Sequence, residues 1–124
     1  MMMPINIIDV NEETFEFEVV NYSSQKPVVV DLWAPWCIPC RVQSQILAQL
    51  AQEGDGEFRL ARINVDEQTR LAERLKVTNV PAFKAFVDGR VVAEYMGVLS
   101  EKNLRLFVDR IMPRAGSLLL VKGN

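Results

Sequence analysis

The sequence predicts an α/β domain in which a mixed β-sheet carries helices on both faces. Strand-like and helix-like segments alternate along the chain, which favours crossover connections that lay helices over a sheet. Residues 26–34 contain a Val-rich run that is apolar on both faces, typical of a central strand covered from both sides. Asp88-Gly89 separates two later strand-like segments, so a hairpin should add an antiparallel strand at one edge.

Five short apolar segments are predicted as strands because they are bounded by turn residues and rich in strand-forming types. In chain order they cover residues 5–9, 26–34, 58–65, 82–87 and 90–95.

Three segments are predicted as helices from their 3.6-residue apolar spacing. The first runs on from Cys40 and stops at Gly54. Its predicted apolar stripe consists of Val42, Ile46, Leu47 and Leu50. The second covers residues 67–76, and the third begins after Ser100, a good N-cap residue.

Residues 14–20 fit two structures. Phe15, Phe17 and Val19 alternate with glutamates, which is the period of a strand. Phe15, Val19 and Val20 also fit one face of a helix, and Asn11 could cap it. The local pattern alone favours the strand slightly.

The composition fits one ordinary domain and excludes several classes of function. The chain has 124 residues, of which 49% are hydrophobic and 24% charged. Its net charge of −2 gives little electrostatic basis for binding nucleic acid. The absence of His excludes Ser-His-Asp and Cys-His nucleophilic pairs and His-ligated metals within this chain.

The sequence also indicates where the protein works. The N-terminal residues have no basic flank and no long apolar run, unlike a signal peptide. The longest apolar runs, such as residues 118–121, are far shorter than the roughly 20 residues that span a bilayer. We therefore expect a cytoplasmic protein with no membrane partner. In that reducing compartment a cysteine pair is more often catalytic or metal-binding than structural.

Cys37-Ile38-Pro39-Cys40 lies directly after the predicted central strand and opens a helix, a position typical of a redox pair. Unpaired N–H groups and the helix dipole favour an anion at the helix N-terminus, so Cys37 should be the activated thiolate and the more exposed sulfur. Half of a zinc site and a purely structural disulfide are the alternatives. The zinc site would need a symmetric dimer, since a third Cys and His are both absent. We expect no metal site.

Asp31 lies inside the Val-rich strand, shortly before the cysteines. A carboxyl group in apolar surroundings has a raised pKa and can exchange protons near neutral pH. The alternative is an ordinary strand Asp that faces solvent. The apolar residues on both sides of Asp31 favour burial.

The segment from Val29 to Arg41 resembles the active-site segment of the thioredoxin family. The resemblance continues through residues 61–66 and 80–83, through Asp88-Gly89 and Gly97, to the last helix, and covers about residues 5–112. It implies the thioredoxin fold and dithiol–disulfide exchange with protein disulfide substrates. It also implies that residues 14–20 are helical, with Phe17 off the buried face.

The resemblance implies a role for each site residue. Cys37 would attack a substrate disulfide, Cys40 would resolve the mixed disulfide, and Asp31 would accept the proton of Cys40. Cys37 and Cys40 would then form the redox-active disulfide. The implied substrate-binding residues are Trp36, Ile38, Pro39, Val80, Pro81 and Gly97.

Three further features follow from the same resemblance. Pro81 would be the cis-proline of the family, while Trp33 and Arg62 would modulate the site. Ile38 and Arg62 stand where the family usually has Gly and Lys. The chain itself would need no cofactor, and a thioredoxin-reductase-type flavoprotein using NADPH would restore the dithiol.

Residues 1–112 are predicted to form the domain and residues 113–124 a C-terminal tail. Leu118 to Val121 give the tail an apolar patch, which we expect to cover the domain's own surface in a monomer. The alternative is a weak dimer through the tail. Residues 111–114 also resemble the end of the thioredoxin domain of a bacterial co-chaperone. The rival function is therefore a binding module or co-chaperone domain, although the Cys37/Cys40 pair favours a disulfide reductase.

Overall fold

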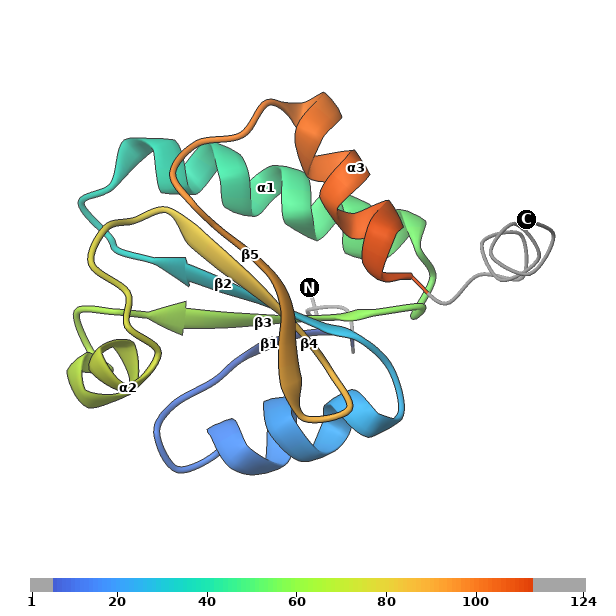
Figure 1. Cartoon of the computed structure of the whole chain (residues 1–124). Helices are drawn as coiled ribbons and strands as arrows, with labels where there is room; N and C mark the ends of the chain where they lie inside the picture. Colours follow the sequence, from blue (N-terminus) through green and yellow to red (C-terminus); the bar gives the residue numbers. More distant parts are fainter. Residues whose placement is uncertain (1–5, 113–124) are drawn as a thin grey trace, which may run out of the picture.

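The computed structural model describes residues 6–112, and the predicted tail lies outside them. Its centre is a five-stranded mixed sheet with the strand order β1-β3-β2-β4-β5 (Figure 1). The strands are β1 (Ile7–Asp9), β2 (Val28–Trp33), β3 (Arg59–Asn64), β4 (Ala82–Val87) and β5 (Arg90–Met96). All five predicted strands are therefore confirmed, with ends that differ by a few residues.

Strand β2 lies in the middle of the sheet. It runs parallel to β3 and antiparallel to β4, while β5 pairs antiparallel with β4 at the edge. Asp31, near the middle of β2, is opposite Arg62 on one side and Phe83 on the other. The carboxyl ends of β2 and β3 point to the same side of the molecule, where α1 (Ile38–Glu53) begins (Figure 1).

Helices cover both faces of the sheet, as predicted (Figure 1). The first face carries α1 and α3 (Glu101–Ile111), and the second carries η1 (Glu16–Asn21) and α2 (Thr69–Arg74). Successive side chains of a strand point to opposite faces. The core therefore divides into two apolar clusters, with Val29 in the first and Val30 in the second.

Residues 15–20 belong to a helix and Thr14 to the turn before it, so the slight local preference for a strand is wrong and the implication of the family resemblance is right apart from Thr14. A π-helix over Glu16–Asn21 continues into a 3-10 helix, η2 (Tyr22–Ser24). Phe15 and Val19 are buried against the second face of the sheet, whereas Phe17 is 71% exposed. A strand would put Phe17 on the same face as Phe15 and Val19, whereas the helix buries Phe15 and Val19 one turn apart and leaves Phe17 outside.

The turn before η1 explains how the helix starts. The Asn11 side-chain oxygen accepts hydrogen bonds from the backbone N–H groups of Glu13 and Thr14, at 2.9 and 2.8 Å. These bonds satisfy donors that have no intrahelical partner, as an N-cap does.

The buried face of α1 differs from the predicted stripe. Val42 is 54% exposed, so its place in the stripe was wrong. The residues buried on α1 are Cys40, Gln43, Ser44, Leu47, Leu50 and Ala51. Two uncharged polar side chains therefore face the interior. The second predicted helix is also shorter than residues 67–76, because α2 ends at Arg74 and Lys76 takes a positive φ of 60°.

The hairpin between β4 and β5 is confirmed. Asp88 and Gly89 both have positive φ, 51° and 79°, as a tight two-residue hairpin turn requires. The turn is fastened to η2, because the N–H groups of Asp88 and Gly89 donate to the carbonyl and hydroxyl oxygens of Ser23. Across residues 6–112, no helix has the length and apolar character needed to cross a membrane.

Phe15 and Phe17 provide a matched pair that tests the helix. Phe15 is 1% exposed and contacts the Phe86 ring edge-on, at 5.8 Å between ring centroids. We expect Phe15→Ala to lower the free energy of unfolding by about 3–5 kcal/mol, because it leaves a cavity. Phe17→Ala, at an exposed position, should change it by about 0.5 kcal/mol or less. Urea unfolding followed by circular dichroism measures both, and equal losses would support a strand instead.

Candidate active site

The two cysteines lie at the junction between strand β2 and helix α1. They form a disulfide with Cα atoms 5.3 Å apart. Cys37 is the N-cap of α1, and its own N–H donates to the carbonyl of Ala34 at 3.1 Å. The backbone N–H of Cys40 donates to Cys37 Sγ at 3.2 Å. The sulfur of Cys37 therefore accepts one of the unpaired N–H groups of the helix, which favours negative charge on that sulfur once the pair is reduced.

Both cysteines are buried in the disulfide. Cys37 is 3% exposed and Cys40 1%, so the order agrees with the prediction but the difference is small. They pack with Ala34 in a small apolar cluster, against which the half-buried Trp33, Val65 and Val80 also lie.

An apolar rim surrounds the disulfide. Trp36 and Ile38 are each 68% exposed on either side of Cys37, and Pro39 is exposed as well. The Trp36 indole N–H donates to Asp66 Oδ1 at 3.4 Å, which links the rim to the segment that follows β3. Exposed apolar groups gathered at one place mark a surface that binds another molecule.

The Val80–Pro81 bond is cis, as the resemblance implies. Pro81 is buried, and its carbonyl accepts a hydrogen bond from the N–H of Gly97 at 2.8 Å. Gly97 has a φ of 123°, a conformation that residues with a side chain rarely adopt. The structure thus brings Val80 and Pro81 to the cysteine cluster. The hydrogen bond to Pro81 holds the Gly97 segment, residues 97–99, next to them.

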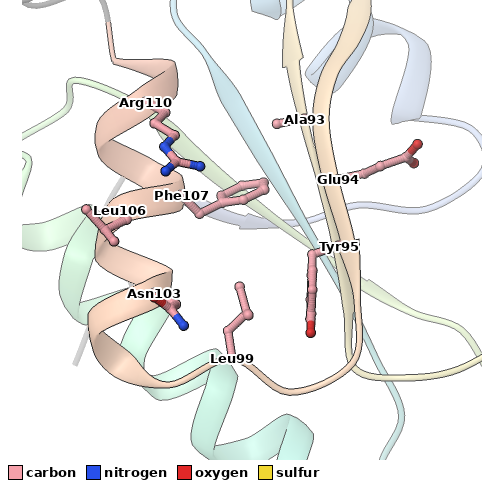
Figure 2. A pocket seen from close by; sticks show the side chains of 8 residues that line it. All are labelled: Ala93, Glu94, Tyr95, Leu99, Asn103, Leu106, Phe107 and Arg110. Atoms are coloured by element: carbon pink, nitrogen blue, oxygen red, sulfur yellow. The ribbon is translucent and has the colours of Figure 1, made fainter.

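A groove of about 480 Å³ opens beside the rim. Trp36, Val65 and Val80 form its wall on the disulfide side, and Thr69, Ala72 and Glu73 of α2 form part of the opposite wall. A second cavity, of about 380 Å³, lies between β5 and α3 (Figure 2). None of the predicted site residues line this second cavity.

Asp31 is fully buried, which confirms the expectation from its apolar neighbours. Its Oδ2 accepts a 2.6 Å hydrogen bond from the Ser44 hydroxyl and lies 3.7 Å from Arg62 Nε. Burial raises the pKa of the Asp31 carboxyl from 3.8 to about 6, although the Ser44 hydrogen bond and the Arg62 charge oppose the rise. The group can therefore exchange a proton close to neutral pH.

Trp33 and Arg62 lie together beside this carboxyl. The Arg62 guanidinium carbon is 4.7 Å from the centre of the Trp33 ring, a cation–π contact. Arg62 also lies 3.9 Å from Asp9 Oδ1, so it stands between two carboxylates, one buried and one exposed. The two predicted modulating residues are thus in contact with each other, and Arg62 reaches Asp31.

The sequence reasoning missed two polar residues on α1, Gln43 and Ser44. Gln43 is 1% exposed, and its amide makes two hydrogen bonds to the backbone of Leu99. Its Nε2 donates to the Leu99 carbonyl at 2.7 Å, and its Oε1 accepts from the Leu99 N–H at 3.0 Å. Leu99 ends the Gly97 segment and leads into α3 (Figure 2). This pair of bonds, the Gln43–Leu99 clamp, joins the cysteine-bearing helix to the Gly97 segment.

A signal for both residues was present in the sequence. Cys40, Gln43, Ser44 and Leu47 are spaced at i, i+3, i+4 and i+7, which is one face of a helix. The polar members conceal that face, and the predicted stripe therefore includes the exposed Val42 in place of Gln43 and Ser44, although its Leu47 and Leu50 are buried. Within residues 6–112, no group of three or more His, Cys, Asp or Glu side chains is arranged to hold a metal ion.

Comparisons with known proteins agree with this geometry. The thioredoxin family model matches residues 6–110. Thioredoxin C-2 of Corynebacterium nephridii is 32% identical over 108 residues, which are 87% of this chain and 98% of that protein. The thioredoxin of Pseudomonas aeruginosa is 33% identical, over 86% of this chain and 97% of the relative. That of Acidithiobacillus ferridurans is 35% identical, over 83% and 94% respectively.

The family model spans nearly the whole described domain, including the segment with the paired cysteines at the start of α1. The mixed sheet with helices on both faces is the thioredoxin fold. The chain therefore belongs to the thioredoxin family, and its Cys37–Cys40 pair makes it a thiol–disulfide oxidoreductase that reduces protein disulfides.

Proposed function

We propose that Cys37 attacks and Cys40 resolves in this reaction. The Cys37 thiolate attacks one sulfur of a substrate disulfide, which breaks that bond, forms a mixed disulfide and releases the other sulfur as a thiolate that takes up a proton. Cys40 then loses its proton and attacks Cys37 Sγ. The Cys37–Cys40 disulfide forms, and the second substrate sulfur leaves. Two electrons have passed from the dithiol to the substrate. The hydrogen bond from the Cys40 N–H to Cys37 Sγ is the observation that carries this assignment.

Asp31 is proposed as the base that accepts the proton of Cys40. It is supported by its place in β2 behind the start of α1, and by the burial that brings its pKa to about 6. A group with such a pKa is partly protonated and partly ionised near neutral pH, as general base catalysis requires.

The substrate surface is proposed to consist of the apolar rim and the groove next to it. Trp36, Ile38 and Pro39 would contact the side chains of a polypeptide that carries the disulfide. The backbone of Val80 would pair with that polypeptide, with Pro81 and Gly97 holding the Val80 segment in place. The exposed indole and the Ile38 side chain support an apolar rather than a charged partner surface.

Each turnover leaves the cysteines oxidised, so an external reductant must restore them. We propose a thioredoxin-reductase-type flavoprotein that draws electrons from NADPH. A continuous supply of such electrons is a condition of the cytoplasm, which supports the location expected from the sequence.

Two single-cysteine variants test the roles of the thiols. Cys40→Ser retains Cys37, and Cys37→Ser retains Cys40. At neutral pH the reduced Cys40→Ser protein should react with iodoacetamide about tenfold faster or more, because Cys37 lies at the helix N-terminus. Faster labelling of Cys40 would reverse the assignment.

The same variants separate the enzyme from the binding-module alternative. The wild-type chain should accelerate reduction of insulin disulfides by dithiothreitol, and both variants should fail to do so. Cys40→Ser should accumulate a mixed disulfide visible by mass spectrometry. A folded wild-type protein that does not accelerate insulin reduction would favour the binding module.

Asp31→Asn should slow resolution while leaving the first attack nearly unchanged. Removing the base affects only the step in which Cys40 loses its proton. Loss of a general base typically slows such a step by about 10²–10⁴-fold. Rapid mixing with insulin, followed by acid quenching, measures both steps. If neither rate changes at neutral pH, Asp31 has no role as a base.

The same substitution predicts a pH-dependent gain in stability. The pKa of Asp31 is higher in the folded chain, about 6, than the 3.8 of a free carboxyl group. The folded state therefore loses stability as pH rises from about 4 through about 6. Asp31→Asn lacks that loss and should be more stable than wild type by roughly 1–3 kcal/mol at neutral pH. The gain should vanish near pH 4, and urea unfolding at both pH values checks it.

For residues outside the described part, we propose from the sequence alone that the chain is a monomer whose tail covers its own surface. Deleting residues 114–124 should then lower the melting temperature by about 2–5 °C and leave insulin reduction nearly unchanged. Light scattering measures the mass in parallel. A change from dimer to monomer on truncation would show that the tail joins two chains, and unchanged stability would show that it contributes nothing.

A further inference from the structure

We propose that Ser44 is a positioning residue for the buried base, holding one oxygen of Asp31 so that the other receives the proton of Cys40. This inference rests on the proposed role of Asp31 and adds a residue that acts through it.

The contact between the two side chains is short and closed to solvent. The Ser44 hydroxyl lies 2.6 Å from Asp31 Oδ2, with Ser44 8% exposed and Asp31 0% exposed. An ionised carboxylate can only accept hydrogen bonds, so the serine hydroxyl is the donor. Hydrogen bonds to a charged acceptor are stronger than neutral ones, and burial adds to their strength.

Helix geometry places this contact next to the dithiol. Cys40 and Ser44 are related as i and i+4 on α1, so they lie one above the other on the same buried face. A side chain of β2 that reaches Ser44 is therefore within about one helical turn of Cys40. The hydroxyl therefore fixes the carboxyl about one helical turn from the resolving cysteine.

The two oxygens of Asp31 have different surroundings. Oδ2 accepts from Ser44 and faces Arg62 Nε at 3.7 Å. Oδ1 is buried and has no hydrogen-bond partner among the described residues. Protonation of Oδ1 leaves the Ser44 hydrogen bond on the other oxygen, whereas protonation of Oδ2 would weaken that bond by removing the negative charge of its acceptor. Oδ1 is therefore the oxygen that takes the proton.

The other charged groups near Asp31 cannot replace the hydroxyl. Arg62 of β3 faces Oδ2 at a longer distance and shares its charge with Asp9 of β1. On β4, Asp31 is opposite Phe83, and the next residue, Lys84, points to the other face, where it pairs with Glu94 of β5. Of the side chains that α1 buries, only the thiol of reduced Cys40 has an acidic proton to give.

The test compares four single variants and one double variant over a range from about pH 5 to pH 9. Ser44→Ala removes the hydroxyl, and Ser44→Thr keeps it. Asp31→Asn removes the base, and Gln45→Ala alters the exposed neighbour of Ser44 as a control. Single-turnover reduction of insulin gives the rates of attack and of resolution, and ¹³C NMR titration of the Asp31 carboxyl gives its ionisation directly.

We expect Ser44→Ala to move the pH midpoint of resolution, and of the NMR titration, upward by about one pH unit. Below that midpoint, resolution should be up to about tenfold slower, because fewer molecules hold an ionised Asp31. The attack by Cys37 should not change. Ser44→Thr and Gln45→Ala should behave like wild type.

The double variant Asp31→Asn/Ser44→Ala separates the possible failures. In the Asp31→Asn background, Ser44→Ala should have no further effect on resolution. A midpoint that does not move in Ser44→Ala, while Asp31→Asn still slows resolution, would overturn the role of Ser44 and leave Asp31 as the base. If Ser44→Ala slowed resolution equally in the wild-type and the Asp31→Asn backgrounds, the role of Ser44 would also be overturned. No effect of Asp31→Asn itself would refute the base, and the role of Ser44 with it.

Discussion

The burial of one carboxyl group in the middle of the sheet is the constraint on which the rest of the site depends. Asp31 can hold a proton near neutral pH only because β2 is central and covered on both faces. The same strand must end where α1 begins, so that Cys37 reaches the N-terminus of the helix and Cys40 lies on its buried face. Strand order, helix coverage and the position of the dithiol are thus three aspects of one arrangement.

Most of the fold could be predicted because local signals agreed with burial. The Val-rich strand, the Asp88-Gly89 turn and the helix after Ser100 all appear where the sequence placed them. Residues 14–20 could not be assigned from local pattern, because Phe15 and Phe17 are equally apolar and only one of them packs on the sheet. The choice between them is made by tertiary contacts, which no short window of sequence contains.

The candidate site divides in the same way. The sequence predicted a redox pair from the spacing of Cys37 and Cys40, and a buried carboxyl from the apolar neighbours of Asp31. The family resemblance supplied the cis bond before Pro81. Gln43 and Ser44 were not found, because each acts through a partner distant in the sequence, 56 and 13 residues away. A polar residue on a helix is usually solvated, so its type alone gives no reason to place it inside.

The Gln43–Leu99 clamp has a consequence for how the enzyme passes through its cycle. Over one turnover the site gains and loses a covalent bond, and in the proposed mechanism Asp31 gains and loses a proton. A carboxamide has no proton to titrate at physiological pH and takes no part in thiol exchange. The proposed substrate surface is therefore joined to the helix that carries the cysteines by two hydrogen bonds whose groups neither titrate nor exchange electrons. The side chain that holds the proposed substrate surface and the side chains that exchange electrons and protons thus meet at the same helix, but only the latter change state during the cycle.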